Sequence, residues 1–238
     1  MATLHVITPV KDAIENTKSC VAAVMRSKMD RPFHYTLFDD YSSEENAAAL
    51  QKLSADEGFE LVHLKNLTSH PSPNYRLTLQ LAQERALAEG ADLIIIESDV
   101  DIHEDTLQRM CQAAQQHEKV GMVAAVTVDG AGKVNFPYLY AQDWPRKTKA
   151  TRKRLSFCCT LLSNAFLSAI DFKQLDPEKN WYDVFISHQS CKLGFTNLLM
   201  CDNAVLHKPH GSRPWKQLKY THPLKYYWLK LTKGYDKI

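Results

Sequence analysis

A buried strand followed by acidic residues is evident in one stretch, Ala91-Asp92-Leu93-Ile94-Ile95-Ile96-Glu97-Ser98-Asp99-Val100-Asp101. Its four consecutive apolar residues, three of them β-branched, are typical of a strand covered by helices on both faces, as in a parallel sheet. The acids come where such a strand ends, which is where open α/β sheets bind their ligands. Glu97 and Asp99 can direct both carboxylates to one ion, and oxygen ligands suit Mg²⁺ or Mn²⁺ beside a diphosphate. The alternative is an acidic start to the next helix, which Glu104 and Asp105 open.

Strands and helices alternate regularly on the N-terminal side of this stretch. Apolar runs predict strands at 4–9, 33–38 and 59–64, and apolar residues at helical spacing predict helices at 11–28, 47–53 and 75–89. Ser42 or Ser43 can cap the second helix, and Gly90 ends the third. This order, β-α-β-α-β-α-β at short intervals, is typical of a doubly wound parallel sheet.

The C-terminal half has a less regular pattern. We expect a helix at 105–116, a strand at 121–128, a hairpin turn at 129–132 leading into 134–136, a strand at 155–162, a helix at 182–193 and a strand at 195–200. The segment 144–151 is basic and has no periodicity, so we expect a mobile loop there.

Composition favours one globular domain with two basic segments. The chain has 238 residues, 45% of them apolar, and a net charge of only +2, which fits one α/β domain with a small appendage. Six Lys or Arg residues and no acid lie in 146–154, and eight lie in 208–238 against Asp236 alone. The six cysteines show neither a CxxC pair nor zinc-site spacing, so we expect free thiols in a reducing compartment.

The N-terminus has no pattern of a leader peptide, and no apolar run approaches the roughly 18–20 residues of a membrane span. We therefore expect a cytoplasmic location, with membrane association through the C-terminal segment as an option. That segment interleaves lysines with aromatic residues, namely Trp215, Tyr220, Tyr226, Tyr227 and Trp228. The mixture suits a helix lying on a membrane surface. It would also suit single-stranded nucleic acid, which we do not expect as a partner, and the structural alternative is a tail packed by its own aromatics.

Six motifs follow one another along the chain. They are Val6-Ile7-Thr8-Pro9-Val10, Phe38-Asp39-Asp40-Tyr41-Ser42, Asn74-Tyr75-Arg76, Ala88-Glu89-Gly90 with Glu97-Ser98-Asp99-Val100, Asp183 eleven residues before Gly194, and Val205-Leu206-His207. In this order they resemble a family-2-type glycosyltransferase with the GT-A fold, whose DDxS turn and DxD metal motif correspond to the second and fourth. Three positions depart from the family pattern: Glu97 replaces an Asp of the metal motif, and Tyr182 and Phe185 replace acids beside Asp183.

The resemblance implies a GT-A-type, Rossmann-like α/β fold, with a mixed, mostly parallel sheet flanked by helices. It implies a glycosyltransferase domain at 1–209, with a nucleotide-sugar-binding half at 1–101 and an acceptor half at 102–209, followed by a basic aromatic tail at 210–238. The implied activity is a metal-dependent, inverting transfer of a sugar from a nucleotide-sugar donor, UDP-sugar first, in glycan or polysaccharide biosynthesis. The acceptor would be a glycan, a lipid-linked molecule or another hydroxyl compound.

The resemblance also implies roles for particular residues. Donor contacts would come from Thr8, Pro9, Val10, Asp39, Asp40, Arg76, Glu97, Ser98 and Asp99. The ligands of Mn²⁺ or Mg²⁺ would be Asp99, Glu97 and His207. Asp183 would be the general base that takes the proton of the acceptor hydroxyl. Trp181 would offer an apolar face to an acceptor sugar.

Several of these residues have a structural alternative. One of Asp39 and Asp40 would read the base, while the other stabilises a turn. Arg76 would bind the diphosphate or pair with a surface acid. Asp183 could instead be a helix N-cap, and structural roles are the alternative for Trp181 and His207.

Two other functions are compatible with this fold. A sugar-phosphate nucleotidyltransferase would need a Gly-rich, basic loop after the first strand, and the stretch Thr8-Pro9-Val10-Lys11-Asp12 has none. A binding module that keeps the sheet without catalysis, and docks through its basic tail, fits the departures at Glu97, Tyr182 and Phe185.

Overall fold

The structure, a computed structural model, describes residues 4–178, 181–208, 218 and 222–233. In the first half, strands alternate with helices in the order β1 (Leu4–Val10), α1 (Ile14–Met25), β2 (Phe33–Asp39), α2 (Glu44–Glu57), β3 (Glu60–His63), α3 (Tyr75–Ala88) and β4 (Asp92–Ile96). The second half contains β5 (Val100–Asp101), α4 (Thr106–Gln116), β6 (Val120–Val128), β7 (Thr148–Thr151), β8 (Cys159–Leu162), α5 (Asn164–Leu167), α6 (Tyr182–Lys192), β9 (Thr196–His207) and α8 (Pro223–Lys233). The alternation predicted for the N-terminal half is confirmed.

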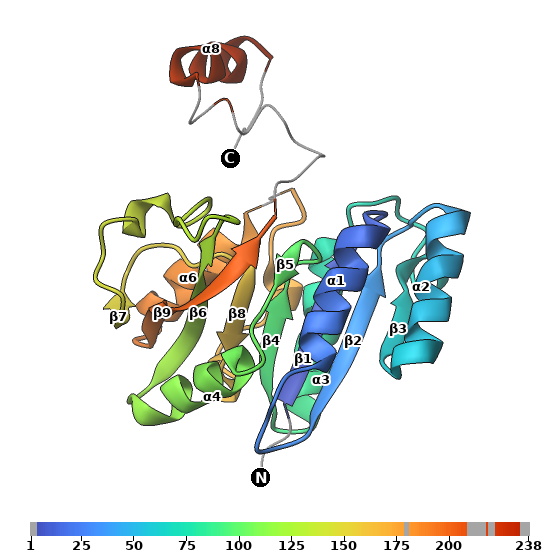
Figure 1. Ribbon diagram of the computed structural model, residues 1–238, viewed down its shortest axis with the longest axis horizontal. Coiled ribbons are helices and arrows are strands. Elements are labelled where there is room, and N and C mark those ends of the chain that lie inside the picture. The colour runs from blue at the N-terminus through green and yellow to red at the C-terminus, as the bar shows by residue number, and fades with distance from the viewer. Residues whose placement is uncertain (1–3, 179–180, 209–217, 219–221, 234–238) are drawn as a thin grey trace.

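These strands form one sheet in the order β3-β2-β1-β4-β8-β6-β9-β5, with β7 paired to β9 (Figure 1). Strands β1, β2, β3, β4, β6 and β9 run in one direction, and β5, β7 and β8 run against it. The predicted mixed, mostly parallel sheet is confirmed. An entirely parallel sheet is wrong, because β8 lies antiparallel between β4 and β6. Through the pairing of β4 with β8, the segments 1–101 and 102–209 contribute to the same sheet.

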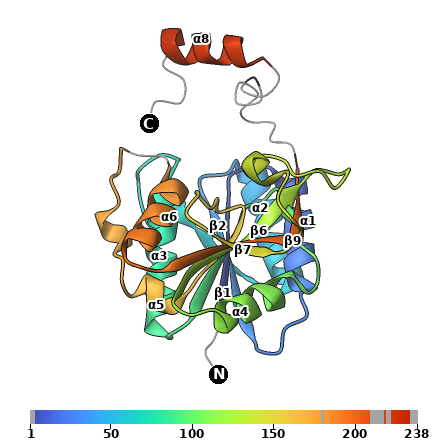
Figure 2. The same cartoon turned by 90° about the vertical axis from the view of Figure 1, so that its left-hand side faces the viewer.

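Helices cover both faces of the sheet (Figure 2). Helices α1, α2 and α4 pack on one face, and α3, α5 and α6 pack on the other. Strand β4 explains how the two layers are joined: Ile94 and Ile96 belong to the first core, whereas Leu93 and Ile95 belong to the second. All four side chains are fully buried, as predicted for a strand with two covered faces, because successive side chains of a strand point to opposite sides.

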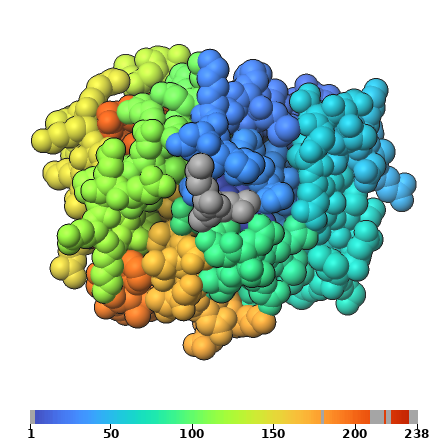
Figure 3. All heavy atoms as spheres, turned by 90° about the horizontal axis from the view of Figure 1, so that it is seen from below, coloured from blue at the N-terminus to red at the C-terminus, as the bar shows by residue number. Residues whose placement is uncertain are grey.

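The carboxyl ends of the parallel strands lie together at one end of the sheet, and the candidate site lies there. Figure 3 views the opposite end, where these strands begin and where segments from the two halves of the chain lie side by side. Gly90 has the positive φ of 62° that a glycine accommodates best, and it ends α3 before β4, as predicted. The turn predicted at 129–132 is also present, with Asp129 N–H donating to the Lys133 carbonyl at 2.9 Å.

Three sequence-based predictions were wrong in extent. The expected loop at 144–151 contains β7, whose polar sequence forms a strand by pairing along the edge of β9. The strand expected at 155–162 begins only at Cys159, because the Leu155 and Ser156 N–H groups donate to side chains, the hydroxyls of Ser187 and Tyr138. The strand expected at 195–200 continues as β9 to His207.

Helix α8 is the one described element of the predicted tail at 210–238, most of which lies outside the described residues. Along the ranges that the structure covers, no helix combines the length and the apolar character that crossing a membrane requires.

Candidate donor and metal site

The site begins at a tight turn after β4. The Val100 N–H donates to the Glu97 carbonyl at 3.0 Å, and the Lys208 N–H donates to the Asp99 carbonyl at 3.0 Å. Strand β5 then pairs with the end of β9, with Val100 opposite His207. This turn therefore places Asp99, whose side chain is almost fully buried, beside the last residue of a distant strand.

Asp99 and His207 face each other across this pairing. Asp99 Oδ2 lies 3.6 Å from His207 Nε2, and both side chains are 5% exposed. The other ring nitrogen, Nδ1, lies 2.7 Å from the Phe136 carbonyl, which can only accept, so Nδ1 carries a proton. A histidine whose second nitrogen donates to a backbone carbonyl has the tautomer and orientation of a metal ligand. Asn135 adds a bond from its amide Nδ2 to the His207 carbonyl at 3.0 Å.

Glu97 lies beside Cys158, which was not among the predicted site residues. Cys158 Sγ donates to Glu97 Oε2 at 3.3 Å, and the Glu97 N–H donates to the Cys158 carbonyl at 3.0 Å. Burial, and then the charge of Glu97, raise the pKa of this thiol well above its usual range. Ligand atoms of Glu97, Cys158 and His207 all lie within 4.8 Å of one another. Asp99 lies at the edge of this group, against His207.

Tyr75, the first residue of α3, connects the two sides of the site. Its pKa is raised well above the usual value by burial, and then by the nearby carboxylates of Glu97 and Asp183. These acids come from the end of β4 and the start of α6, so the phenol lies near both. Apart from its place in the Asn74-Tyr75-Arg76 motif, nothing in the sequence pattern indicates a role for this residue.

Asp183 lies in the first turn of α6 and is half-buried. The N-cap of this helix is Trp181, so the N-cap alternative for Asp183 is wrong. Its Oδ1 accepts the Val184 N–H at 2.8 Å. Trp181 is half-buried.

Asp39 and Asp40 lie at the carboxyl end of β2, and both are engaged within the protein. Asp39 is fully buried, with Oδ2 2.7 Å from His63 Nδ1. Asp40 accepts three hydrogen bonds at 2.8 Å, one from the Ser72 hydroxyl and two from the N–H and side-chain amide of Asn74. The carboxylate of Asp40 therefore holds the loop that leads into α3.

The other candidate donor contacts surround this end of the sheet. Thr8 is buried and accepts from the Tyr35 hydroxyl at 3.0 Å, while the Val10 carbonyl accepts the Asp40 N–H at 2.8 Å. Pro9 and Ser98 are half-buried. Arg76 donates to the Leu175 carbonyl at 3.1 Å, and this hydrogen bond connects α3 to the segment around Leu175.

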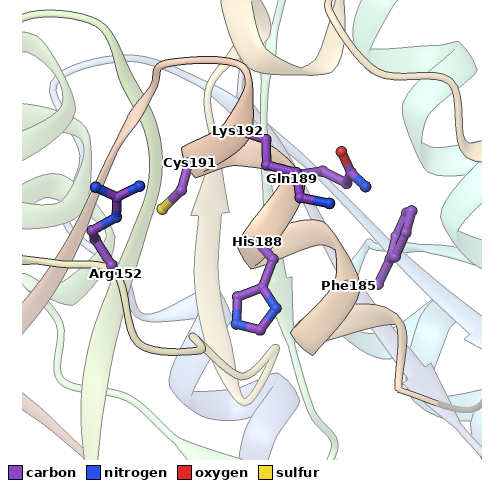
Figure 4. A pocket seen from close by; sticks show the side chains of 6 residues that line it. All are labelled: Arg152, Phe185, His188, Gln189, Cys191 and Lys192. Atoms are coloured by element: carbon purple, nitrogen blue, oxygen red, sulfur yellow. The ribbon is translucent and has the colours of Figure 1, made fainter.

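A separate hollow of about 310 Å³ lies on the outward side of α6 (Figure 4). Arg152 and Lys192 give the lining positive charge, His188 adds an imidazole, and Phe185 contributes an apolar wall. Phe185, His188 and Lys192 share one exposed face of the helix, because they are spaced three and four residues apart. The hollow is outside the cluster around Asp99.

Residues 5–175 match the family described as glycosyl transferase family 2, and the chain therefore belongs to this family. Comparison with curated proteins finds no match.

Solved structures of glycosyltransferases share the GT-A fold of this chain at low sequence identity. TarS of S. aureus, residues 1–349, superposes with a TM-score of 0.64 at 16% identity, covering 87% of this chain and 60% of TarS. The mannosyltransferase PcManGT from Pyrobaculum calidifontis gives 0.64 at 13% identity, covering 96% and 64%. GalNAc-T7 gives 0.65 at 9% identity, covering 87% and 44%. The chain thus spans less than two thirds of the length of each of these proteins.

Proposed function

We propose that this chain transfers a sugar from a nucleotide-sugar donor to an acceptor hydroxyl. The observation that carries the proposal is the approach of Asp99 Oδ2 to His207 Nε2, 3.6 Å apart, at the edge where the parallel strands end. Open α/β sheets bind ligands at this edge, and a carboxylate with an oriented histidine suits a divalent cation. The structure of PcManGT contains GDP-Man and Mn²⁺, one structure of TarS contains UDP-GlcNAc, and that of GalNAc-T7 contains UDP, GalNAc and Mn²⁺.

Asp99 and His207, together with Glu97, would hold Mn²⁺ or Mg²⁺. The donor set fits such an ion, since it combines two carboxylates with an imidazole whose Nδ1–H is fixed by the Phe136 carbonyl. When bound, the cation would neutralise charge on the diphosphate of the donor and of the departing nucleotide.

The nucleotide would lie over the ends of β1 and β2. Asp39 or Asp40 would accept an N–H of the base, and the backbone at Thr8, Pro9 and Val10 would line the base. Because both carboxylates already accept hydrogen bonds from the protein, either one would read the base with an orientation that is fixed before the donor arrives. We expect a UDP-sugar as the first candidate donor. Arg76 and Ser98 would lie along the diphosphate.

Asp183 would act as the general base of an inverting transfer. The acceptor oxygen would give its proton to this carboxylate while forming a bond to the anomeric carbon. The bond from that carbon to the diphosphate oxygen would break, and its electrons would leave with the nucleotide diphosphate. Trp181, two residues before Asp183, would provide an apolar surface for the acceptor.

The exposed surface of α8 favours a membrane location for the protein or for its acceptor. Four apolar side chains at spacings of three, one and three residues form a stripe of high exposure: Leu224 (88%), Tyr227 (53%), Trp228 (60%) and Leu231 (85%). The helix also carries Lys225, Lys230 and Lys233 and no acid. An apolar stripe flanked by lysines is the pattern of a helix lying in the interface of an anionic bilayer, so α8 would bring the site to lipid-linked acceptors.

The proposal is tested by measuring nucleotide release from UDP-, GDP- and dTDP-sugars, with Mn²⁺ and with a chelator. We expect one nucleotide class to be cleaved, slowly onto water and faster with an acceptor, and the chelator to abolish this. Absence of turnover with every donor class, in the presence of Mn²⁺ and a panel of hydroxyl acceptors, would contradict the proposal.

A further inference from the structure

We propose that Cys158 is a sulfur ligand of the divalent cation, so that the site takes thiophilic ions such as Zn²⁺, Co²⁺ or Cd²⁺ in addition to Mn²⁺. This inference rests on the proposed cation site, and extends it to a residue and a class of metal that the proposed function does not include. Three groups of different chemistry meet at this position: the carboxylate of Glu97, the thiol of Cys158 and the imidazole of His207, with ligand atoms all within 4.8 Å of one another.

The spacing of these atoms is close to that of a tetrahedral ion. Zinc binds sulfur at about 2.3 Å and nitrogen or oxygen at about 2.0–2.2 Å, so two ligands of one tetrahedral ion are roughly 3.4–3.6 Å apart. Cys158 Sγ is 3.3 Å from Glu97 Oε2, slightly closer than this range. The other separations between ligand atoms are at most 4.8 Å. Side-chain movements that shorten them by up to about 1.4 Å would complete a site with three protein ligands, the number found in catalytic zinc sites.

The burial of Cys158 beside polar groups favours its role as a metal ligand over that of a free thiol. Cys158 is 2% exposed and His207 is 5% exposed, so the sulfur lies among polar groups in a region shielded from water. A cation at this point would exchange the S–H bond for a sulfur–metal bond, and the proton would leave to the buffer. Thiolate and imidazole ligands favour zinc-like ions, whereas carboxylates alone suit Mg²⁺ and Mn²⁺.

The neighbouring residue supplies a matched control. Cys159 is also fully buried, but its Sγ contacts Met110 Sδ at 3.7 Å, on the side of α4 and away from the group described above. Cys158→Ser would remove the proposed ligand. Cys159→Ser would replace the adjacent buried thiol and leave the proposed ligand in place.

Cobalt reports this ligand directly, because bound thiolate gives Co²⁺ a charge-transfer absorption band in the near ultraviolet. The purified full-length chain, its Cys158→Ser variant and its Cys159→Ser variant would be titrated with Co²⁺ without donor, and bound metal would be measured by equilibrium dialysis. We expect the band in the wild type and in Cys159→Ser, and its loss in Cys158→Ser. We also expect Cys158→Ser to weaken Cd²⁺ binding by at least about tenfold, the lower end of what loss of a supporting residue costs at metal sites, and to change Mn²⁺ binding far less.

A wild type that binds no Co²⁺, that binds it without the band, or that keeps the band in Cys158→Ser would overturn the inference. If the serine variant does not fold, Cys158→Ala removes the sulfur without adding a hydroxyl to the buried site, and the same outcomes apply. Nucleotide release with Mn²⁺ is measured on the same wild-type sample. Turnover without a sulfur band would overturn this inference alone, whereas a band without turnover would contradict only the proposed function.

Discussion

His207 Nε2 lies 3.6 Å from Asp99 Oδ2, although one residue ends β9 and the other follows β4. The contact depends on a short antiparallel pairing, in which Val100 of β5 lies opposite His207. The Phe136 carbonyl then fixes the imidazole from the other side at 2.7 Å. The result is a pair of potential ligands from distant parts of the sequence, oriented by the backbone before any ion arrives.

Asp183→Asn should abolish transfer and spare donor binding. The amide keeps the shape of the side chain but cannot accept the acceptor proton, and loss of a general base typically costs 10²–10⁴-fold in rate. The measurement is the transfer rate together with the affinity for the nucleotide diphosphate. Glu178→Gln, an exposed acid before the same helix, is the control and should behave like the wild type. Equal loss in both variants would rule out a specific role for Asp183.

Tyr75→Phe should leave the free energy of unfolding unchanged or slightly raised. Within the part of the chain that the structure describes, Tyr75 Oη is buried and makes no hydrogen bond. The variant therefore loses no hydrogen bond when the hydroxyl is removed. Tyr138→Phe is the matched control. Its hydroxyl donates to the Ser156 carbonyl and accepts the Ser156 N–H. The Thr160 hydroxyl also donates to this carbonyl, so the variant leaves the buried Ser156 N–H unpaired, which should cost about 1–3 kcal/mol. Urea unfolding distinguishes the two variants; a Tyr75→Phe loss as large as that of Tyr138→Phe would show that the Tyr75 hydroxyl is bonded.

Gly121→Ala should destabilise the sheet at the packing of β6 against α6. A Cβ at this position would lie 2.1 Å from Ser190 Oγ and 2.8 Å from Phe195 Cβ, and forcing such contacts apart typically costs about 1–3 kcal/mol. Gly130→Ala, where a Cβ would meet nothing within 4 Å, should change stability by no more than about 0.5 kcal/mol. Thermal unfolding of the two variants checks the packing, which would be incorrect if they were equally stable.

The sequence predicted much of the fold and only part of the site. Local patterns were sufficient to predict β1 to β4 and their helices. The clearest case is the run from Leu93 to Ile96, which has the length and composition of a strand buried on both faces and is fully buried. Strand direction is not a local property, so the antiparallel insertion of β8 could not be predicted. The polar strand β7 exists because it pairs with β9, and its own residues carry no strand signal.

The site likewise contains residues that the sequence predicted and residues that it did not. Glu97, Asp99 and His207 were selected because each lies near the end of a strand with a recognisable motif. Cys158 and Tyr75 join them through the register of β8 beside β4 and the position of α3, neither of which can be read from residue spacing. Packing between segments that are distant in the sequence therefore adds Cys158 and Tyr75 to the residues that the motifs identify.

Replacing Leu224 and Leu231 by serine should weaken binding to anionic vesicles by at least about tenfold, because burying a single leucine contributes roughly 1.5–3 kcal/mol. Co-sedimentation with phosphatidylcholine vesicles, with and without phosphatidylglycerol, measures this, and we expect binding to require the anionic lipid. The matched control replaces Leu67 and Leu193, which are 56% and 41% exposed and lie outside α8. No vesicle binding by the wild type, or equal loss in the control, would contradict a membrane role for α8.

The most direct test of the central claim is calorimetric titration of UDP, GDP and dTDP, each with and without Mn²⁺, into the wild type, Asp99→Ala and His207→Ala. His188→Ala, which changes an exposed histidine on α6, is the control. We predict that one nucleotide binds the wild type and His188→Ala only with Mn²⁺, and that Asp99→Ala and His207→Ala lose this binding by at least about tenfold. Nucleotide binding that needs no metal, or that survives both substitutions unchanged, would contradict a donor site built on Asp99 and His207.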